Sequence, residues 1–259
     1  MKDLINLIMQ FSGLGQDMLQ IGFYVFLRVA AAMAVIPAFG DQAVPQRVKL
    51  VIALAFTAVV APAVASQFTK VETPSATLFL TETIAGLIIG LGLRFFIHTL
   101  QIAASIIAQA TTLSQLFAGT GPDPQPAIGN ILVMAGLALA VQSGLHLQVA
   151  ELLILSYGPL AAGQFPGTSD VANWGLTQIA QAFSLGFSLA APFVVASFIY
   201  NVAIGVINRA MPSLMVSLIG APALAAGGLV LFAVVAPLGL GAWISALQNY
   251  ISAPFDLSP

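Results

Sequence analysis

Long apolar segments, separated by short loops that hold many of the charged residues, form the dominant pattern along this chain. A helix needs about 20 largely apolar residues to cross the hydrocarbon core of a bilayer. Six segments approach or exceed that length, so the pattern predicts an all-α, polytopic membrane protein built of kinked helical hairpins. The expected spans cover about residues 18–39, 50–65, 77–116, 128–156, 176–208 and 213–250.

The last two segments are longer than a simple span requires. Each holds more than 30 residues. At about 1.5 Å of rise per residue they reach roughly 45–55 Å, against a hydrocarbon core of about 30 Å. We expect these helices to tilt, to bend at Pro192, Pro222 or Pro237, or to extend beyond the bilayer into other protein.

The composition supports a membrane protein and excludes several other classes. Hydrophobic residues make up 59% of the 259 positions and charged residues only 6%, whereas a soluble domain is about 25% charged. The net charge of −2 gives no basis for binding nucleic acid. With no cysteine in the chain, disulfides and thiolate chemistry are excluded.

The distribution of basic residues predicts an orientation. Four of them fall on one side of the six expected spans, and only Lys2 and Lys70 fall on the other. The positive-inside rule then places both termini on the periplasmic side. The apolar stretch after Lys2 is too short for a signal peptide, so we expect an uncleaved chain. The four residues expected on the cytoplasmic side are Arg47, Lys49, Arg94 and Arg209.

No motif for catalysis is present. His98 and His146 are far apart, and neither belongs to a His-Glu-x-x-His helix that could hold zinc. The chain also lacks a Gly-x-Ser-x-Gly elbow and a phosphate-binding loop. We therefore expect a protein that is not an enzyme and that carries no metal or cofactor.

Charged residues inside apolar segments are candidates for function, because a charge in the bilayer is costly. Glu82 and Arg94 share one segment, but twelve residues of helix separate them by roughly 18 Å and about 120°, so they cannot pair. Each needs a partner elsewhere or an aqueous surface; alternatively, both lie at the ends of the segment and face headgroups or water. Arg28 and Glu151 leave the same options open.

Two glycines follow Glu82 at helical spacing. Gly86 and Gly90 form a Gly-x-x-x-Gly pair, which lets a second helix approach at backbone distance. Glycine is also common in membrane helices generally, and this chain has 23 of them.

The sharpest break in the apolar pattern lies at residues 119–126, which contain two glycines and three prolines. Irregular backbone at membrane depth is tolerated only where it is buried in protein or lines an aqueous cavity. This loop is either an ordinary surface connection or a re-entrant pore element. In the second case Leu113, Leu116 and Phe117 could seal a conduit by apolar contact, and Gly119 and Gly121 would let the loop move.

A set of short motifs, taken in order, resembles the FliR family of type III secretion export-gate subunits. The resemblance covers nearly the whole chain, and its most specific part lies in the last third. The matching pieces are Arg28–Ala32 with Pro37–Gly40 and Val44-Pro45, Glu82 with Gly86 and Gly90, Asp123-Pro124, Gly144 with His146, Ser156 and Pro159, Asn201–Gly205, Asn208–Pro212, and Ile219–Pro222.

This resemblance implies an inner-membrane protein of the flagellar basal body that assembles with FliP-like and FliQ-like subunits. Residues 1–175 would be the FliP-like part, with a plug loop near 113–127, and residues 176–259 the FliQ-like long hairpin. The turn at Asn208, Arg209 and Pro212 would contact an FlhB-like switch protein on the cytoplasmic side. The plug and gate residues would be Leu113, Leu116, Phe117, Gly119, Gly121, Asp123 and Pro124.

The function implied is the conduction of unfolded flagellar proteins across the inner membrane. One alternative is the homologous gate of a virulence injectisome. A more distant one is a secondary transporter in which Glu82, Arg94 or His146 binds a solute or proton. A transporter of that kind predicts an internal repeat of several spans, and the first four spans do not resemble the last two.

Overall fold

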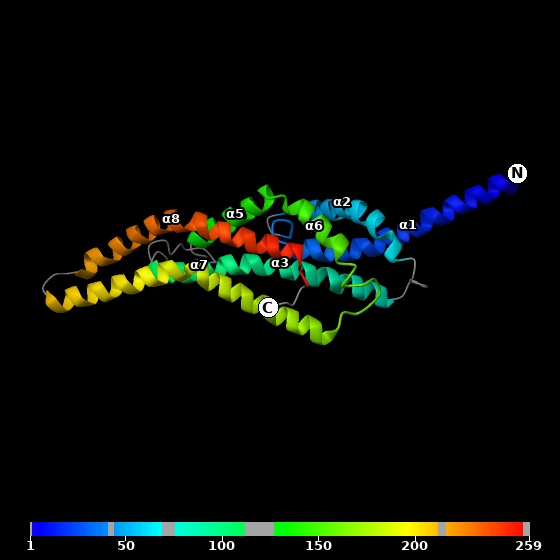
Figure 1. The fold of residues 1–259 in the computed structure, drawn as a ribbon. Coiled ribbons are helices and arrows are strands. Elements are labelled where there is room, and N and C mark those ends of the chain that lie inside the picture. The colour runs from blue at the N-terminus through cyan, green and yellow to red at the C-terminus, as the bar shows by residue number, and fades with distance from the viewer. Residues whose placement is uncertain (1, 41–43, 69–75, 112–126, 212–215, 256–259) are drawn as a thin grey trace. The chain divides into compact units, whose positions relative to one another are not determined.

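The structure, a computed structural model, describes residues 2–40, 44–68, 76–111, 127–211 and 216–255. Over these residues the regular structure is helical throughout, which confirms the predicted all-α class. Figure 1 shows the order of the helices along the chain. The elements are α1 (Lys2–Val35), α2 (Gln46–Val64), the short 3-10 helix η1 (Ala65–Gln67), α3 (Ala76–Thr111), α5 (Ala127–Gln142), α6 (Leu145–Leu155), α7 (Thr168–Ala210) and α8 (Val216–Ser252).

The described helices account for the six predicted spans, with one correction. Five helices are long and apolar enough to cross a membrane, and the pair α5–α6 brings the number to six if it forms one broken span. The sequence predicted a single span over 128–156, but α5 and α6 meet at an angle of 72°. Gly144 lies at the bend with φ of 81°, a left-handed conformation that glycine adopts at little cost.

Two predicted loop boundaries are wrong. The fifth span was expected to begin at about residue 176, yet α7 begins at Thr168, with Asp170 in its first turn, where a carboxylate complements the helix dipole. Arg47 and Lys49 were expected in the first charged loop, but they lie in the first turn of α2, directly after Pro45. Proline is common at helix starts, because its missing N–H would have no intrahelical partner there.

The chain divides into two compact units. Unit 1 contains residues 1–94, 144–176 and 251–259, and unit 2 contains residues 95–143 and 177–250. The two units do not correspond to the predicted parts 1–175 and 176–259, which were drawn from likeness to two other subunits, and that division stays a prediction.

Unit 1 is built around the apolar face of α1. Val25, Val29, Ala32 and Ile36 are fully buried, and their spacing of three and four residues places them on one side of the helix. Helix α1 packs against α2, and α2 packs against α6. The core residues contributed by the other helices are Ala53, Val60 and Val64 in α2, Leu78, Ala85, Ile89 and Leu93 in α3, and Val149, Leu152 and Leu153 in α6.

Unit 2 joins α5 to the end of α3 and to the hairpin of α7 and α8, which run alongside each other (Figure 1). Small residues allow close approach: a side chain at Gly186 would meet the Thr99 carbonyl oxygen and Ile102 at 3.0–3.2 Å. Trp243 anchors α8, since its buried indole Nε1 donates a 2.8 Å hydrogen bond to the Phe96 carbonyl oxygen. The central cluster consists of Ala104, Ile107, Ile128, Leu132, Ala190, Phe193 and Ala225.

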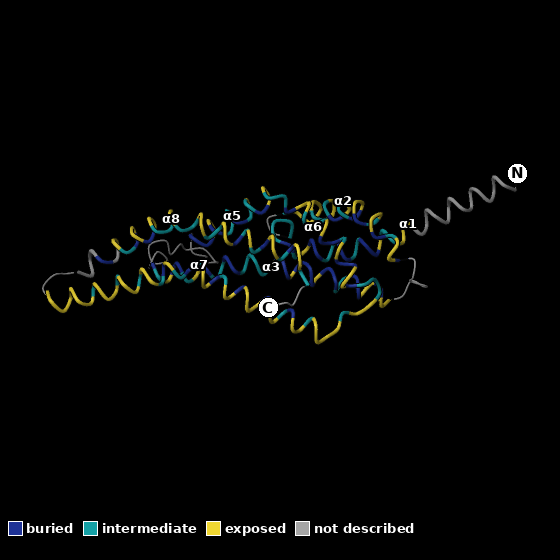
Figure 2. Tube along the Cα trace, viewed as in Figure 1, coloured by how far each residue is buried: buried dark blue, intermediate teal, exposed yellow. Residues whose placement is uncertain are grey.

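Helices α7 and α8 expose most of their apolar surface. Within an 18-residue apolar window, only 17% of the residues of Thr168–Ala210 and 11% of those of Pro222–Ser252 are buried within the chain, and Figure 2 shows exposed residues along both helices. With 43 residues, α7 is about 65 Å long, more than twice the hydrocarbon core of about 30 Å. The bilayer alone therefore cannot cover it if it stands upright.

Candidate functional site

A buried ion pair lies at the centre of unit 1. Arg28 of α1 and Glu82 of α3 face each other with both side chains at most 1% exposed. The guanidinium binds the carboxylate through two parallel contacts, from Nε to Oε2 at 2.8 Å and from Nη2 to Oε1 at 3.1 Å. This two-bond geometry is the strongest that arginine and a carboxylate form. Two separate spans are thus held together by opposite charges.

Two further guanidinium hydrogens bind the segment that follows α6. Nη1 donates to the Ser156 hydroxyl at 3.1 Å, and Nη2 donates to the Leu160 carbonyl oxygen at 2.8 Å. Ser156 in turn donates to the Leu153 carbonyl oxygen at 2.7 Å. Arg28 therefore connects three stretches of chain that are more than 50 residues apart in sequence.

Tyr157 contacts both members of the pair. Its hydroxyl donates to Glu82 Oε2 at 3.1 Å, and its ring lies under the guanidinium carbon of Arg28 at 3.6 Å, a cation–π contact. Burial is the largest cause that raises the pKa of the Tyr157 phenol above its ordinary value, so the hydroxyl stays protonated and acts as a donor. Phe68 packs edge-on against Tyr157 and stacks on Tyr24, so three aromatic rings lie in a row beside the ion pair.

Gly86 and Gly90 lie where α1 and α3 approach each other. A β-carbon on Gly86 would clash with the Arg28 carbonyl oxygen and lie 3.0 Å from the Ala31 β-carbon. A β-carbon on Gly90 would lie 2.8 Å from the Ala32 carbonyl oxygen. The absence of side chains at these two positions lets the backbones come close enough for Arg28 to reach Glu82.

We name this network of Arg28, Glu82, Ser156, Tyr157 and the Leu160 carbonyl the charge centre. Among the described residues, no buried side-chain nitrogen or oxygen lacks a hydrogen-bond partner. Both carboxylate oxygens of Glu82 are occupied, and the side chain is fully buried, so it is not available to bind a solute. The arrangement can hold helices in register, but it offers no open ligand position.

The other candidate residues lie apart from the charge centre. Arg94, His146 and Glu151 are exposed, and Arg94 makes a long 3.4 Å contact with the Val35 carbonyl oxygen. Within the described residues, no group of three or more His, Cys, Asp or Glu side chains could hold a metal. Asn208 and Arg209 are exposed at the end of α7. Pro212 and the predicted plug residues Leu113, Leu116, Phe117, Gly119, Gly121, Asp123 and Pro124 lie outside the described residues.

The alternative that Glu82 faces headgroups or water is wrong, because its side chain is 0% exposed. Sequence reasoning named Arg28 and Glu82 separately but did not pair them, and it gave no role to Tyr157. One signal could have predicted this pair: Arg28 and Glu82 carry opposite charges in two different apolar segments. Unlike charges inside a membrane protein tend to pair with each other.

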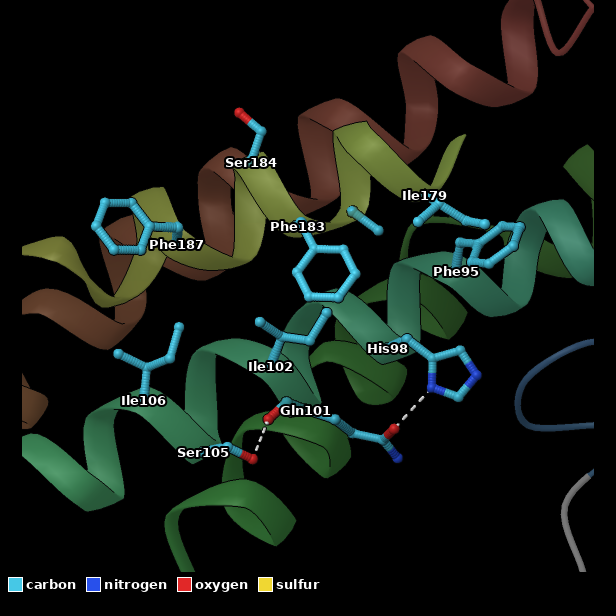
Figure 3. A pocket seen from close by; sticks show the side chains of 11 residues that line it. Phe95, His98, Gln101, Ile102, Ser105, Ile106, Ile179, Phe183, Ser184 and Phe187 are labelled. Carbon is cyan, nitrogen blue, oxygen red and sulfur yellow. Dashed lines mark hydrogen bonds between the residues drawn. The ribbon is translucent and has the colours of Figure 1, made fainter. Parts of the chain in front are cut away.

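Unit 2 contains an open groove between α3 and α7. It encloses about 1060 Å³. Figure 3 shows Phe183 pointing from α7 toward Ile102 of α3, and His98, Gln101 and Ser105 lie along the adjoining side of α3, at the edge of the groove. His98 Nδ1 lies 2.8 Å from Gln101 Oε1, and Ser105 Oγ donates to the Gln101 carbonyl oxygen at 2.9 Å. The rest of the lining is mainly aromatic and aliphatic: Phe95, Ile102, Ile106, Ile179, Ala182, Ser184 and Phe187.

The helices and the charge centre together define a polytopic helical membrane protein whose spans are tied to one another by a buried ion pair. The sequence pattern of the family described as bacterial export proteins, family 1, matches residues 19–250. The chain belongs to this family, which confirms the resemblance drawn from the motifs. It is an export-gate component, a transport protein and not an enzyme.

Individual relatives agree with the family match. The chain is 34% identical over 205 residues to the flagellar biosynthetic protein FliR of Caulobacter vibrioides, covering 76% of this chain and 81% of that protein. It is 30% identical over 227 residues to the protein of the same name in Escherichia coli, covering 85% of each. A third relative, FliR of Bacillus subtilis, is 25% identical over 205 residues.

Proposed function

We propose that this chain is the FliR subunit of the flagellar type III export gate, and that it conducts unfolded flagellar proteins across the bacterial inner membrane. The observation that carries the proposal is the extent of the match. Relatives named FliR in different bacteria align with 76–85% of the chain at 25–34% identity. The family match over residues 19–250 includes both the charge centre of unit 1 and the long hairpin of unit 2.

The proposed partners are FliP-like and FliQ-like subunits. The support is physical: α7 and α8 present apolar side chains over about 65 and 55 Å, and only a small share of this surface is buried within the chain. Lipid covers about 30 Å of such length. Helices of other subunits would cover the remainder, and the most exposed side chains include Leu176, Phe198 and Leu238.

The proposed orientation places both termini in the periplasm and the end of α7 in the cytoplasm. Arg209 is exposed in the last turn of α7, where a cation complements the helix dipole and where the positive-inside rule favours the cytoplasm. We expect Asn208, Arg209 and Pro212 to contact an FlhB-like switch protein there, and the plug loop near 113–127 to close the conduit.

Co-purification from mild detergent tests the proposal. The chain is produced with its FliP-like and FliQ-like neighbours, with a tag on this chain alone. A stable complex of all three, and restored motility in a strain that lacks its own copy, are the expected results. If the chain elutes as a monodisperse monomer or homo-oligomer free of those subunits, the gate assignment is wrong.

A further inference from the structure

The second half of α3 carries a row of polar side chains without formal charge among mainly apolar residues. His98, Gln101, Ser105 and Gln109 follow one another at spacings of three, four and four residues, which places them on one face. Ser105 and Gln109 are exposed, and His98 and Gln101 are partly exposed. We call this row the α3 polar stripe. At about 1.5 Å per residue it extends over roughly 17 Å.

Two hydrogen bonds within α3 involve residues of the stripe. His98 pairs with Gln101, and Ser105 donates to the Gln101 carbonyl oxygen on the same helix (Figure 3). The side chains around it carry no formal charge: across the described residues of unit 2, the only lysine, arginine, aspartate or glutamate is Arg209. The stripe is therefore polar and carries no formal charge.

Lipid does not suit this surface. Polar side chains in membrane-spanning segments face the interior of a bundle or a water-filled cavity, because hydrocarbon offers them no hydrogen bonds. The stripe instead borders the groove of about 1060 Å³ whose opposite side is formed by Phe183 and its neighbours on α7. Water can enter a groove of this size and reach the polar side.

We propose that the α3 polar stripe and the facing side of α7 line part of the aqueous path along which the exported polypeptide moves. The inference rests on the proposed function and identifies which face of this chain contacts the cargo. An unfolded polypeptide presents charges of both signs, apolar side chains and peptide groups. A neutral lining of Ser, Gln and His beside Phe can contact all of these without holding any of them by charge.

The chain contains no cysteine, so a single introduced cysteine gives an unambiguous probe. Ser105→Cys and Gln109→Cys are made separately in the complete gate, and a charged, membrane-impermeant methanethiosulfonate reagent is applied to exporting membranes. Ala104→Cys is the matched control, because Ala104 is the neighbour of Ser105 on the same helix but is only 1% exposed. Labelling of this chain is measured by its shift in mass.

The expected result is modification of Ser105→Cys and Gln109→Cys at least roughly tenfold faster than of Ala104→Cys, since a buried thiol is unreactive. A stalled export substrate should protect both positions and should form disulfide cross-links to them through a cysteine of its own. Equal labelling of all three variants, or cross-links from Ser105→Cys to a neighbouring gate subunit with none to the cargo, would overturn the inference.

Export itself separates the two proposals. Motility restored by the variants together with no labelling of Ser105→Cys or Gln109→Cys overturns the lining of the path and leaves the proposed function in place. Failure of the unaltered chain to support export overturns the proposed function, and the inference fails with it.

Discussion

Gly86 lies directly against the backbone carbonyl of Arg28. The side chain of the same arginine binds Glu82, which lies one helical turn before Gly86 on α3. The two contacts depend on each other. Close approach of α1 and α3 at Gly86 brings the guanidinium within reach of the carboxylate, and the ion pair in turn holds the helices at that distance. The missing side chain at Gly86 and the buried ion pair thus both contribute to the close packing of α1 against α3.

Gly86→Ala is expected to destabilise the protein by about 1–3 kcal/mol, because its β-carbon would push the two backbones apart. The thermal midpoint of the purified complex measures the change. Gly22→Ala, in α1, is the matched control: a β-carbon there meets nothing within 4 Å, so this variant should keep the midpoint of the parent. Equal midpoints for both variants would show that α1 and α3 are not in close contact.

Glu82→Gln should lower stability by about 3–5 kcal/mol, since it leaves the Arg28 guanidinium buried without its counter-charge. The level of the chain in membranes and its thermal midpoint in detergent both report this loss. Glu151→Gln removes the same charge from an exposed position on α6 and should change neither quantity. A stable Glu82→Gln protein would mean that the carboxylate is not the main partner of Arg28.

Replacing both members of the pair should be less harmful than replacing one. Buried ion pairs exchanged for apolar residues of similar volume are often close to neutral, whereas a single charge left behind is costly. Arg28→Met combined with Glu82→Leu is therefore expected to be more stable than Arg28→Met alone, measured by the same thermal midpoint. Additive losses in the double variant would contradict direct coupling of the two residues.

The bend between α5 and α6 depends on the left-handed backbone of Gly144. Gly144→Ala should cost about 1–2 kcal/mol, because an L side chain is strained in that conformation. Gly144→Asn is a suitable control, since asparagine tolerates left-handed backbone better than alanine does. We expect the midpoint of the asparagine variant to lie between those of the parent and the alanine variant.

Arg209→Glu is expected to reduce motility while the assembled complex remains intact, because Arg209 is exposed in the last turn of α7. Swimming in soft agar and co-purification of the subunits measure the two effects separately. Loss of the complex would instead identify Arg209 as an assembly residue.

Much of the fold could be predicted from hydropathy, because apolar length is a direct consequence of bilayer thickness. The bend at Gly144 could not, since the residues on both sides of it are equally apolar and a single φ angle decides it. The start of α7 at Thr168 was missed for the opposite reason. Its first turns contain Asp170 and other polar residues, so the helix continues where the hydropathy signal is weak.

The charge centre shows a second limit of the sequence. The spacing along one helix correctly excluded a pair between Glu82 and Arg94, but no local rule selects Arg28 from the remaining arginines. The choice follows from which faces of α1 and α3 meet, and Gly86 and Gly90 are the local signs of that contact. Tyr157 carried no signal at all, because its role depends on the turn after α6.

The two charges of the charge centre are synthesised at different times. Arg28 leaves the ribosome 54 residues ahead of Glu82, which at about 5–20 residues per second amounts to roughly 3–11 seconds of synthesis. During that interval the first span holds an arginine without its counter-ion, a state that a bilayer disfavours. The first span is therefore less stable in lipid alone than after the third span has arrived, and contact with the insertion machinery would lower that cost.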